Sequence, residues 1–394
     1  ASDTVLVGWH LAKALWDAGI PKEALQFVPC SGGEVGSNLI TDPRVNCVIL
    51  TGGTETAKKF LQMRPDLDLA AEAGGKNSMI ITALSDRDLA VKDLLQSAFG
   101  HAGQKCSAAS LAILEAEVYD DPHFLKHLKE AAASLKVGPA WNPTTKINPL
   151  IHAPTGVLKR GLTTLEKGEE WLLEPKQDPK NPCLWSPGIK LGVQAGSFTH
   201  MTELFGPVLG LMRANNLEHA IELANAVPYG LTSGLQSLDE REKTFWIENI
   251  EAGNCYINRT ITGAIVRRQP FGGCKASSFG NGSKAGGPNY ICEFMHAKQL
   301  GLPQEKHPVN EWVNSLTAFL ENIDLTAEQL GLWTASTANY AYWWKRMRQD
   351  RDPTKIVGQD NLFRYVPRKG IALRIDAHSS ALDVLRVCAA ALTC

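Results

Sequence analysis

Runs of apolar residues alternate along the chain with segments in which apolar side chains recur every three or four positions. An apolar run over 45–53 ends in two glycines and is followed by a helical pattern over 54–62. The same succession returns over 77–82 and 86–99. Continuous apolar strands that alternate with amphipathic helices are typical of parallel sheets covered on both faces, so the pattern predicts an α/β fold.

The remaining predicted elements continue this alternation. We expect strands over 25–29, 110–119, 209–214, 231–237, 254–259 and 370–376, and helices over 5–19, 122–135, 217–226, 239–250 and 379–392. Residues 138–200 are rich in Pro, Gly and Asn, which predicts a looped excursion around one helix. The segment 306–352 has an aromatic and helical pattern.

Length and charge exclude several classes of protein. The chain has 394 residues, of which 44% are hydrophobic and 21% are charged, as in globular proteins. The net charge of −1 gives no attraction toward nucleic acid or an anionic membrane, and no apolar run reaches the ~18 residues of a membrane span. The stretch YAYWWKRMRQDR (340–351) fits a nucleic-acid contact or an amphipathic helix that buries its tryptophans. The balanced charge elsewhere favours the amphipathic helix.

Cysteine usage and the two ends of the chain predict its setting. The nine cysteines show no CxxC spacing, so we expect neither a zinc cluster nor a disulfide framework. The first residues lack the basic and apolar regions of a secretory signal, and we therefore expect a cytoplasmic protein. The chain opens directly in a helical pattern and closes without a cap, which predicts that it is cut from a longer protein.

Two candidate chemical groups lie in glycine-rich surroundings. Cys106, within GQKCSAAS, is flanked by small residues that leave a thiol accessible, and its backbone amide is suited to hold an oxyanion. The alternative is a small cysteine buried in the core. Glu72, within EAGGKN, lies at a strand edge, where burial raises the pKa of a carboxyl toward that of a general base. The alternative is a surface glutamate at a turn.

Three further stretches have the residues of a cofactor or substrate site. The GGT stretch at 52–54 joins a strand to a helix whose first amides suit a phosphate, although a plain tight turn explains the same residues and GxGxxG is absent. Glu203, in ELFGPV, is either a carboxylate for a ribose diol or an ordinary loop glutamate. Residues 259–280 form a glycine-rich loop around Phe271 that is more irregular than packing requires.

Together these stretches resemble the aldehyde dehydrogenase superfamily. The motifs that carry the resemblance are TGGTETA, EAGGKN, GQKCSA, ELFGPV and QPFGGCKASS, in the family's order, over roughly residues 1–300. Glu72 and Cys106 are 34 positions apart, the spacing of the family's base and nucleophile. The resemblance is strongest to the Δ1-pyrroline-5-carboxylate dehydrogenase branch, in particular to the dehydrogenase part of bifunctional proline utilisation A proteins. The stretch KAGGPNYI and the extension to residue 394 also resemble that branch.

The resemblance implies a function and a set of roles. The activity would be NAD-dependent oxidation of L-glutamate γ-semialdehyde to L-glutamate in proline catabolism, with Cys106 as the nucleophile and Glu72 as the base that activates water. The resemblance places Gly52, Gly53, Thr54 and Glu203 beside NAD, and Ser107, Gly263, Ala264 and Phe271 around the amino acid end of the substrate.

The resemblance also implies how the chain is divided. It predicts part of a Rossmann-type NAD-binding domain over 1–72, a catalytic α/β domain over 73–300, a helical linker over 301–352 and the start of a C-terminal α/β domain over 353–394. It places the family's oxyanion asparagine and adenosine-ribose lysine upstream of Ala1. A homo-oligomer is expected, with a proline dehydrogenase domain in the parent chain and with no nucleic-acid partner.

Two other functions stay open at this point. One is an aldehyde dehydrogenase with another acyl substrate, because the motifs for the chemistry are shared across the family. The other is a catalytically silent assembly module formed around 306–394, because part of the family's cofactor and oxyanion site is placed upstream of Ala1.

Overall fold

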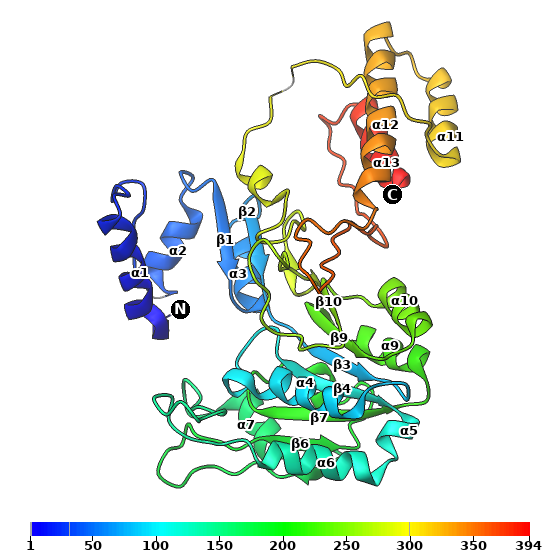
Figure 1. The fold of residues 1–394 in the computed structure, drawn as a ribbon. Helices are drawn as coiled ribbons and strands as arrows, with labels where there is room; N and C mark the ends of the chain where they lie inside the picture. Colours follow the sequence, from blue (N-terminus) through cyan, green and yellow to red (C-terminus); the bar gives the residue numbers. More distant parts are fainter. Residues whose placement is uncertain (1, 31, 299) are drawn as a thin grey trace. The chain divides into compact units, whose positions relative to one another are not determined.

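A computed structural model describes residues 2–30, 32–298 and 300–394 of the chain (Figure 1). Its contacts divide the chain into two compact units, with the boundary between Phe294 and Met295. The finer division into four domains stays a prediction. Each unit is described by itself below.

A seven-stranded sheet forms the centre of the first unit (Figure 1). Its strands lie in the order β10-β9-β3-β4-β7-β6-β5, and all neighbours pair in parallel except β5 with β6. In chain order the strands are β3 (Asn77–Ile81), β4 (Ala109–Glu115), β5 (Glu170–Leu173), β6 (Gly188–Leu191), β7 (Val208–Ala214), β9 (Thr232–Gln236) and β10 (Asn254–Ile257). The predicted parallel α/β architecture is confirmed, with one antiparallel strand at its edge.

Helices cover both faces of this sheet, which explains why its strands are apolar throughout. Met79 and Ile81 of β3 pack in one hydrophobic cluster with α4 (Arg87–Phe99) and α6 (Pro122–Ala133). Ile80 faces the other way, into a second cluster with α9 (Leu217–Asn225) and with Trp246 of α10 (Glu240–Asn249). The alternation of side chains along a strand therefore supplies two separate cores.

A smaller sheet and short elements complete the first unit. The parallel pair β1 (Cys47–Thr51) and β2 (Asp68–Glu72) is extended by β12 (Ser278–Phe279), antiparallel to β2. The other elements are η1 (Ser2–Thr4), α1 (Val5–Asp17), α2 (Glu34–Thr41), α3 (Thr54–Met63), η2 (Gly100–Gly103), α5 (Ala116–Tyr119), α7 (Gly156–Thr163), α8 (Phe198–Met201), β8 (Tyr229–Gly230), β11 (Cys274–Lys275) and η3 (Tyr290–Phe294). β2 has a direct functional consequence, because it ends at Glu72.

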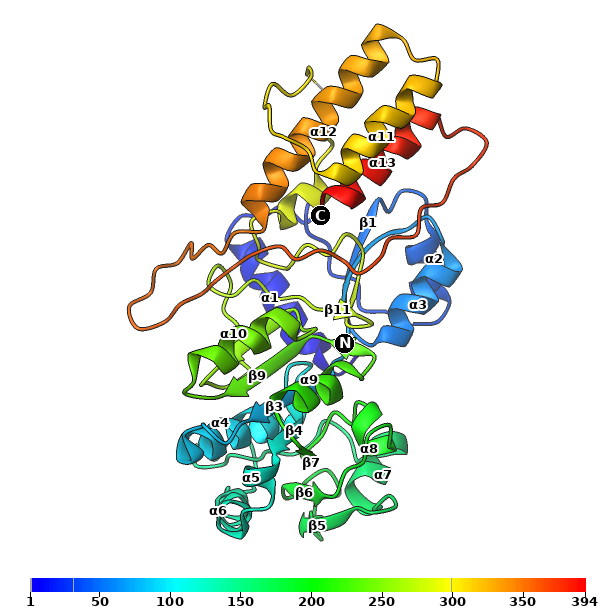
Figure 2. The same cartoon turned by 90° about the vertical axis from the view of Figure 1, so that its right-hand side faces the viewer.

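The second unit is built from helices that lie side by side in both views (Figures 1 and 2). They are α11 (Glu311–Phe319), η4 (Leu320–Asn322), α12 (Ala327–Met347) and α13 (Ala381–Thr393). Trp333 is 2% exposed in their core, and its indole N–H donates to the Thr317 hydroxyl at 3.0 Å. The sequence pattern predicts that the tryptophans within 340–351 are buried as well. That expectation is wrong for Trp343, which is 47% exposed, because it lies outside this core.

Several predicted elements differ from the structure. The stretches 25–29 and 370–376 form no strand, because a strand needs a hydrogen-bonded neighbour and none of the described residues pairs with either. The strand predicted over 110–119 ends at Glu115, where α5 begins. The excursion over 138–200 contains β5, β6 and α8 as well as its one predicted helix, α7, and neither α2 nor β2 was predicted.

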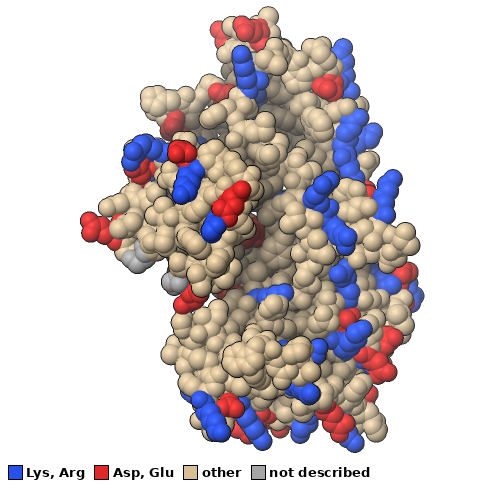
Figure 3. Space-filling model, turned by 60° about the vertical axis from the view of Figure 1, so that its left-hand side comes forward, with Lys and Arg blue, Asp and Glu red and all other residues tan. Residues whose placement is uncertain are grey.

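Charge and hydropathy agree with the composition. Acidic and basic side chains both occur on the face drawn in Figure 3. None of the helices in the described ranges is both long and apolar enough to cross a membrane.

Candidate active site

Cys106 lies in a loop between α4 and β4. After α4 the backbone passes through positive φ at His101, Ala102 and Gly103. A Cβ at Gly103 would collide with the carbonyl of Gly206, so only glycine fits this turn. The turn brings the chain to the amino end of β4, so the thiol lies at the amino ends of the parallel strands.

A buried asparagine at the start of β3 fixes the cysteine loop. The Asn77 side-chain amide donates to the carbonyl oxygens of Cys106 at 2.7 Å and Ala108 at 2.9 Å. Its carbonyl oxygen accepts from the Thr232 N–H of β9 at 3.0 Å. The Thr232 hydroxyl in turn donates to the Ser107 carbonyl at 3.3 Å. One side chain therefore holds the loop against two strands of the sheet.

The thiol of Cys106 is half-buried, and the charges of two carboxylates act on it. Burial raises the pKa of the Cys106 thiol, and the charges of Glu203 and Glu72 raise this pKa further. The backbone N–H of Ser107 acts in the opposite direction. The interpretation as a core cysteine does not account for these two carboxylates, which come from distant segments of the chain. Because its pKa is raised, the Cys106 thiol is protonated at neutral pH and must lose this proton to become a nucleophile.

Glu72 is held at the carboxyl end of β2. Its carboxylate accepts from the Gly273 N–H at 3.2 Å, and a Cβ at Gly272 would lie 2.7 Å from its Oε1 atom. Burial raises the pKa of Glu72 to about 7, although the Gly273 N–H and the Lys284 ammonium counteract the rise. A cavity of about 100 Å³ lies beside it, lined also by Phe279. A carboxyl with this pKa exchanges protons readily at neutral pH.

Glu203 reaches the same region from the loop before β7. Its carboxylate accepts from the Gly75 N–H at 2.8 Å, and a Cβ at Gly74 would collide with it. Gly74 therefore makes room for this side chain, whereas the lack of a side chain at Gly75 leaves room for the Cys106 carbonyl and Asn77. Burial raises the pKa of Glu203, while the Gly75 N–H and the Lys76 ammonium lower it.

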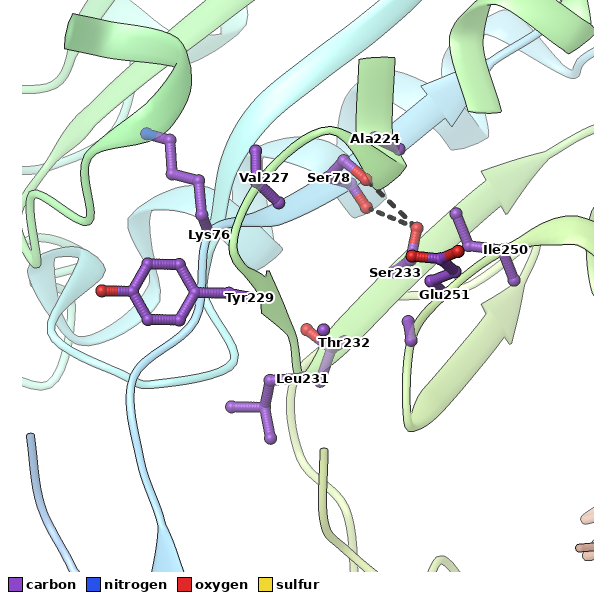
Figure 4. A pocket seen from close by; sticks show the side chains of 12 residues that line it. Lys76, Ser78, Ala224, Val227, Tyr229, Leu231, Thr232, Ser233, Ile250 and Glu251 are labelled. Carbon is purple, nitrogen blue, oxygen red and sulfur yellow. Dashed lines mark hydrogen bonds between the residues drawn. The ribbon is translucent and has the colours of Figure 1, made fainter. Parts of the chain in front are cut away.

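The charge of Glu203 acts on Lys76 and Tyr229, whose side chains project to the same side in Figure 4, away from Ser78. Lys76 is 3% exposed, and its Nζ atom has no hydrogen-bond partner among the described residues. Burial lowers the pKa of Lys76 to about 7, and Glu203 counteracts this change. The pKa of Tyr229 is raised by burial and by Glu203, and lowered by Thr54.

The predicted GGT turn adjoins both glutamates. The Gly52 N–H donates to the backbone carbonyl of Glu72 at 3.1 Å, and the Thr54 hydroxyl donates to the Ala276 carbonyl at 3.0 Å. Gly53 caps the N-terminus of α3, and a Cβ at Gly53 would meet no atom within 4 Å. The start of α3 is therefore open. Thr54 hydrogen-bonds Tyr229, and the charge of Glu203 also acts on Tyr229. An open helix start with these groups nearby fits a dinucleotide such as NAD.

The four predicted substrate residues are distributed over two segments. Ser107 is buried beside Cys106, and Phe271 exchanges two backbone hydrogen bonds of 3.0 Å with Ala285. Gly263 is exposed with φ of +90°, and Ala264 follows it. No described hydrogen bond joins Gly263 or Ala264 to the cysteine loop directly.

The Gly263 loop is instead tied to the helix that leads to Cys106. The buried Ser97 hydroxyl of α4 donates to the Asp93 carbonyl at 2.6 Å and accepts from the Ile261 N–H at 3.1 Å. We expect Ser97→Ala to lower the free energy of unfolding by about 1–3 kcal/mol in urea titrations, because it leaves the Ile261 N–H buried without an acceptor. Ser134→Ala serves as the control, because it removes an exposed hydroxyl at the end of a different helix, α6. Equal losses in the two variants would contradict this role.

Sequence reasoning missed Asn77, Lys76, Tyr229 and Lys284. The first two stood within EAGGKN, where a lysine and an asparagine open a buried apolar strand, and that contrast was a usable signal. Tyr229 and Lys284 are more than 150 positions from Glu72 in the sequence, and only the folded chain brings them near its site.

Comparison with known proteins places this geometry in context. The sequence profile of the aldehyde dehydrogenase family matches residues 1–300. The chain is 34% identical over 309 residues to 1-pyrroline-5-carboxylate dehydrogenase 1 of Halalkalibacterium halodurans, covering 76% of this chain and 59% of the relative. It is 33% identical over 302 residues to the Bacillus subtilis 1-pyrroline-5-carboxylate dehydrogenase, covering 74% of this chain and 58% of the relative. The chain thus spans less than two thirds of these relatives.

Solved structures show the same similarity. Proline utilization A from Corynebacterium freiburgense superposes with a TM-score of 0.86 at 41% identity, covering 96% of this chain and 38% of that chain. A Thermus 1-pyrroline-5-carboxylate dehydrogenase with bound NAD superposes with a TM-score of 0.69 at 32% identity, covering 75% of this chain and 58% of that chain.

Proposed function

Because the chain belongs to the aldehyde dehydrogenase family, we propose that it carries the thiol and base of an NAD-dependent L-glutamate γ-semialdehyde dehydrogenase. Such an enzyme oxidises the semialdehyde, formed from pyrroline-5-carboxylate, to L-glutamate in proline catabolism. One observation carries the proposal. Glu72, which ends a strand of the small sheet, acts electrostatically on Cys106, which precedes a strand of the large one.

The chemistry follows from the protonation states of these two groups. The Cys106 thiol releases its proton to solvent water, and its sulfur attacks the aldehyde carbon, which forms a thiohemiacetal whose oxyanion is held by the Cys106 backbone N–H. NAD, when bound, accepts the hydride that leaves this carbon. Glu72 then takes a proton from the water that hydrolyses the resulting thioester, so that glutamate leaves and the thiol is restored. The cavity beside Glu72 provides room for that water.

The cofactor residues are proposed from their placement. Gly52, Gly53 and Thr54 at the start of α3 would lie along the pyrophosphate and nicotinamide side, and Glu203 would accept from the nicotinamide ribose. The Thermus relative, whose structure contains bound NAD, supports this assignment.

The substrate's amino acid end is assigned to Ser107, Gly263, Ala264 and Phe271. Backbone N–H groups without bulky side chains suit a carboxylate, and the exposed, left-handed Gly263 presents them to solvent. The chain's similarity to 1-pyrroline-5-carboxylate dehydrogenases supports this choice over other acyl substrates.

We expect Gly263→Asp to raise the KM for glutamate semialdehyde by about tenfold or more relative to Gly263→Asn, because only Asp places a like charge beside the substrate carboxylate. Both variants carry the same positive-φ strain, and a Cβ meets no atom within 4 Å there. Propanal, which has no carboxylate, is the control substrate and should show equal KM values. Equal KM values for the semialdehyde would remove the carboxylate assignment. Wild-type rates on propanal that match those on semialdehyde would point to another acyl substrate.

We further propose that the parent protein also contains a proline dehydrogenase domain, acts in the cytoplasm and forms a homo-oligomer. The first part is supported by the similarity to proline utilization A structures from Corynebacterium freiburgense and Bdellovibrio bacteriovorus. A proline-dependent reduction of a dye by the full-length parent would test it.

A further inference from the structure

Lys284 is a half-buried lysine behind the glycine loop that contacts Glu72. The backbone of Ala285 exchanges hydrogen bonds with Phe271, which places Lys284 beside Gly272. A Cβ at Gly272 would lie 2.7 Å from Oε1 of Glu72 and 3.1 Å from Cγ of Lys284. The carboxylate and the lysine stem therefore both approach the place where Gly272 has no side chain.

The Lys284 ammonium does not donate to the carboxylate itself. It donates to the carbonyl oxygen of Gly253, at the start of β10. The next residue, Asn254, holds the glycine loop from both sides: its amide donates to the Pro270 carbonyl at 2.9 Å, and its oxygen accepts from the Gly272 N–H at 3.1 Å. Lys284 thus anchors the segment that positions the Gly273 N–H against Glu72.

The charge of Lys284 also acts on Glu72 directly. The ammonium counteracts the burial that raises the pKa of Glu72, and the carboxylate in turn counteracts the burial that lowers the pKa of Lys284. The Ser278 hydroxyl, from β12, also lowers the pKa of Glu72, and Glu293 lines the same cavity as Glu72. Cys106 and Tyr290, which also face Glu72, are neutral when protonated. Cys255 and Cys274 face Lys284 from β10 and β11. In the described part of the chain, Lys284 is therefore the cation that acts on the base.

We propose that Lys284 is the positioning residue of Glu72: its ammonium favours the charged form of the carboxylate and anchors the loop that orients it. This inference rests on the proposed function, because it assigns Glu72 the role of the base. Glu72 must be ionised to take a proton from water, yet burial favours its neutral form. A fixed positive charge at short range offsets part of that penalty without capping the carboxylate oxygen that faces the water.

The test uses three variants of the chain. Lys284→Gln keeps a donor for the Gly253 carbonyl but removes the charge, and Lys284→Arg keeps the charge. Lys275→Gln is the matched control, because Lys275 donates to the carbonyls of Asn225 and Val227 and pairs with Glu251, and does not act on Glu72. Thermal unfolding followed by circular dichroism identifies the variants that fold.

The first readout is the titration of the Glu72 carboxyl by NMR in chain labelled with ¹³C at the glutamate carboxyls, with Glu72→Gln used to assign the signal. We expect Lys284→Gln to raise the pKa of Glu72 by about half to one unit, and Lys284→Arg and Lys275→Gln to leave it unchanged. An unchanged titration in folded Lys284→Gln would overturn the inference. If Lys284→Gln does not fold, the same titration in Lys284→Met decides. Failure of both to fold would show a structural role and likewise overturn the inference.

The second readout is the pH profile of turnover. A rise of half to one unit from a pKa near 7 lowers the ionised fraction of Glu72 at pH 7 by about two- to fivefold. We therefore expect kcat to fall by about two- to fivefold at pH 7 and to recover at pH 9, with KM for the aldehyde unchanged. Loss of kcat at every pH would contradict the inference. Wild-type protein that forms no NADH from semialdehyde would instead count against the proposed function, and the carboxyl titration remains readable in that case.

Discussion

Replacing Cys106 by Ser is expected to lower the rate of glutamate semialdehyde oxidation by on the order of 10³-fold or more, measured as NADH formation. A serine hydroxyl fits the same half-buried position, but its pKa is far higher than that of a thiol, so it is almost never ionised at neutral pH. Substrate binding should change little, because the loop is held by Asn77 rather than by the sulfur. The loss should therefore appear in kcat.

Cys183→Ser is the control for this experiment, since Cys183 is another half-buried cysteine that packs against the core of the large sheet. It should retain nearly full activity. Alkylation followed by mass spectrometry gives an independent check. Labelling of Cys106 should accelerate as the pH rises toward its raised pKa. A Cys106→Ser protein that keeps a tenth of the wild-type rate would contradict the assignment of the nucleophile.

Replacing Glu72 by Gln is expected to separate the two halves of the reaction. Acylation of Cys106 yields one equivalent of NADH, after which the thioester accumulates because no base activates water. Stopped-flow absorbance should therefore show a burst followed by turnover about 10²–10⁴-fold slower than in the wild type. Exposed Glu117→Gln is the control and should show no burst. Slow turnover without a burst would place Glu72 in the first half of the reaction instead.

The pH dependence has a definite sign. Burial raises the pKa of Glu72 to about 7 in the folded chain, from an ordinary value of 4.5. The wild-type kcat should therefore rise as the pH increases through about 7. Stability should run the other way, because the folded state holds a proton on Glu72 over the pH range between these two values, and this contribution is lost as the pH rises through the folded pKa. Glu72→Gln should accordingly be more stable than the wild type above pH 7, measured by urea unfolding, and show no such gain at pH 4.

Local pattern was sufficient for most of the regular structure. Strands such as β3 and β4 are covered on both faces, so their apolar runs predict a strand without knowledge of the neighbouring strands. Strands whose formation depends on a distant partner cannot be predicted from the local sequence. β2 begins with an exposed Asp and pairs with β1 and β12, and 370–376 has a strand-like pattern but no described partner.

Some features of the candidate site can likewise be predicted from the local sequence, and others cannot. The cysteine between small residues and the glycine pair after Glu72 are local features, and so the sequence by itself determined the α/β class, the family resemblance and the residues to examine. Only the tertiary structure decided which groups act on one another. The structure places Glu203 on the Gly75 N–H and Lys284 beside Glu72. It also leaves the Lys76 ammonium buried, with no hydrogen-bond partner in the described part of the chain. Burial and distance between charges set the pKa of a group, and both are properties of segments brought together by folding, which no local pattern records.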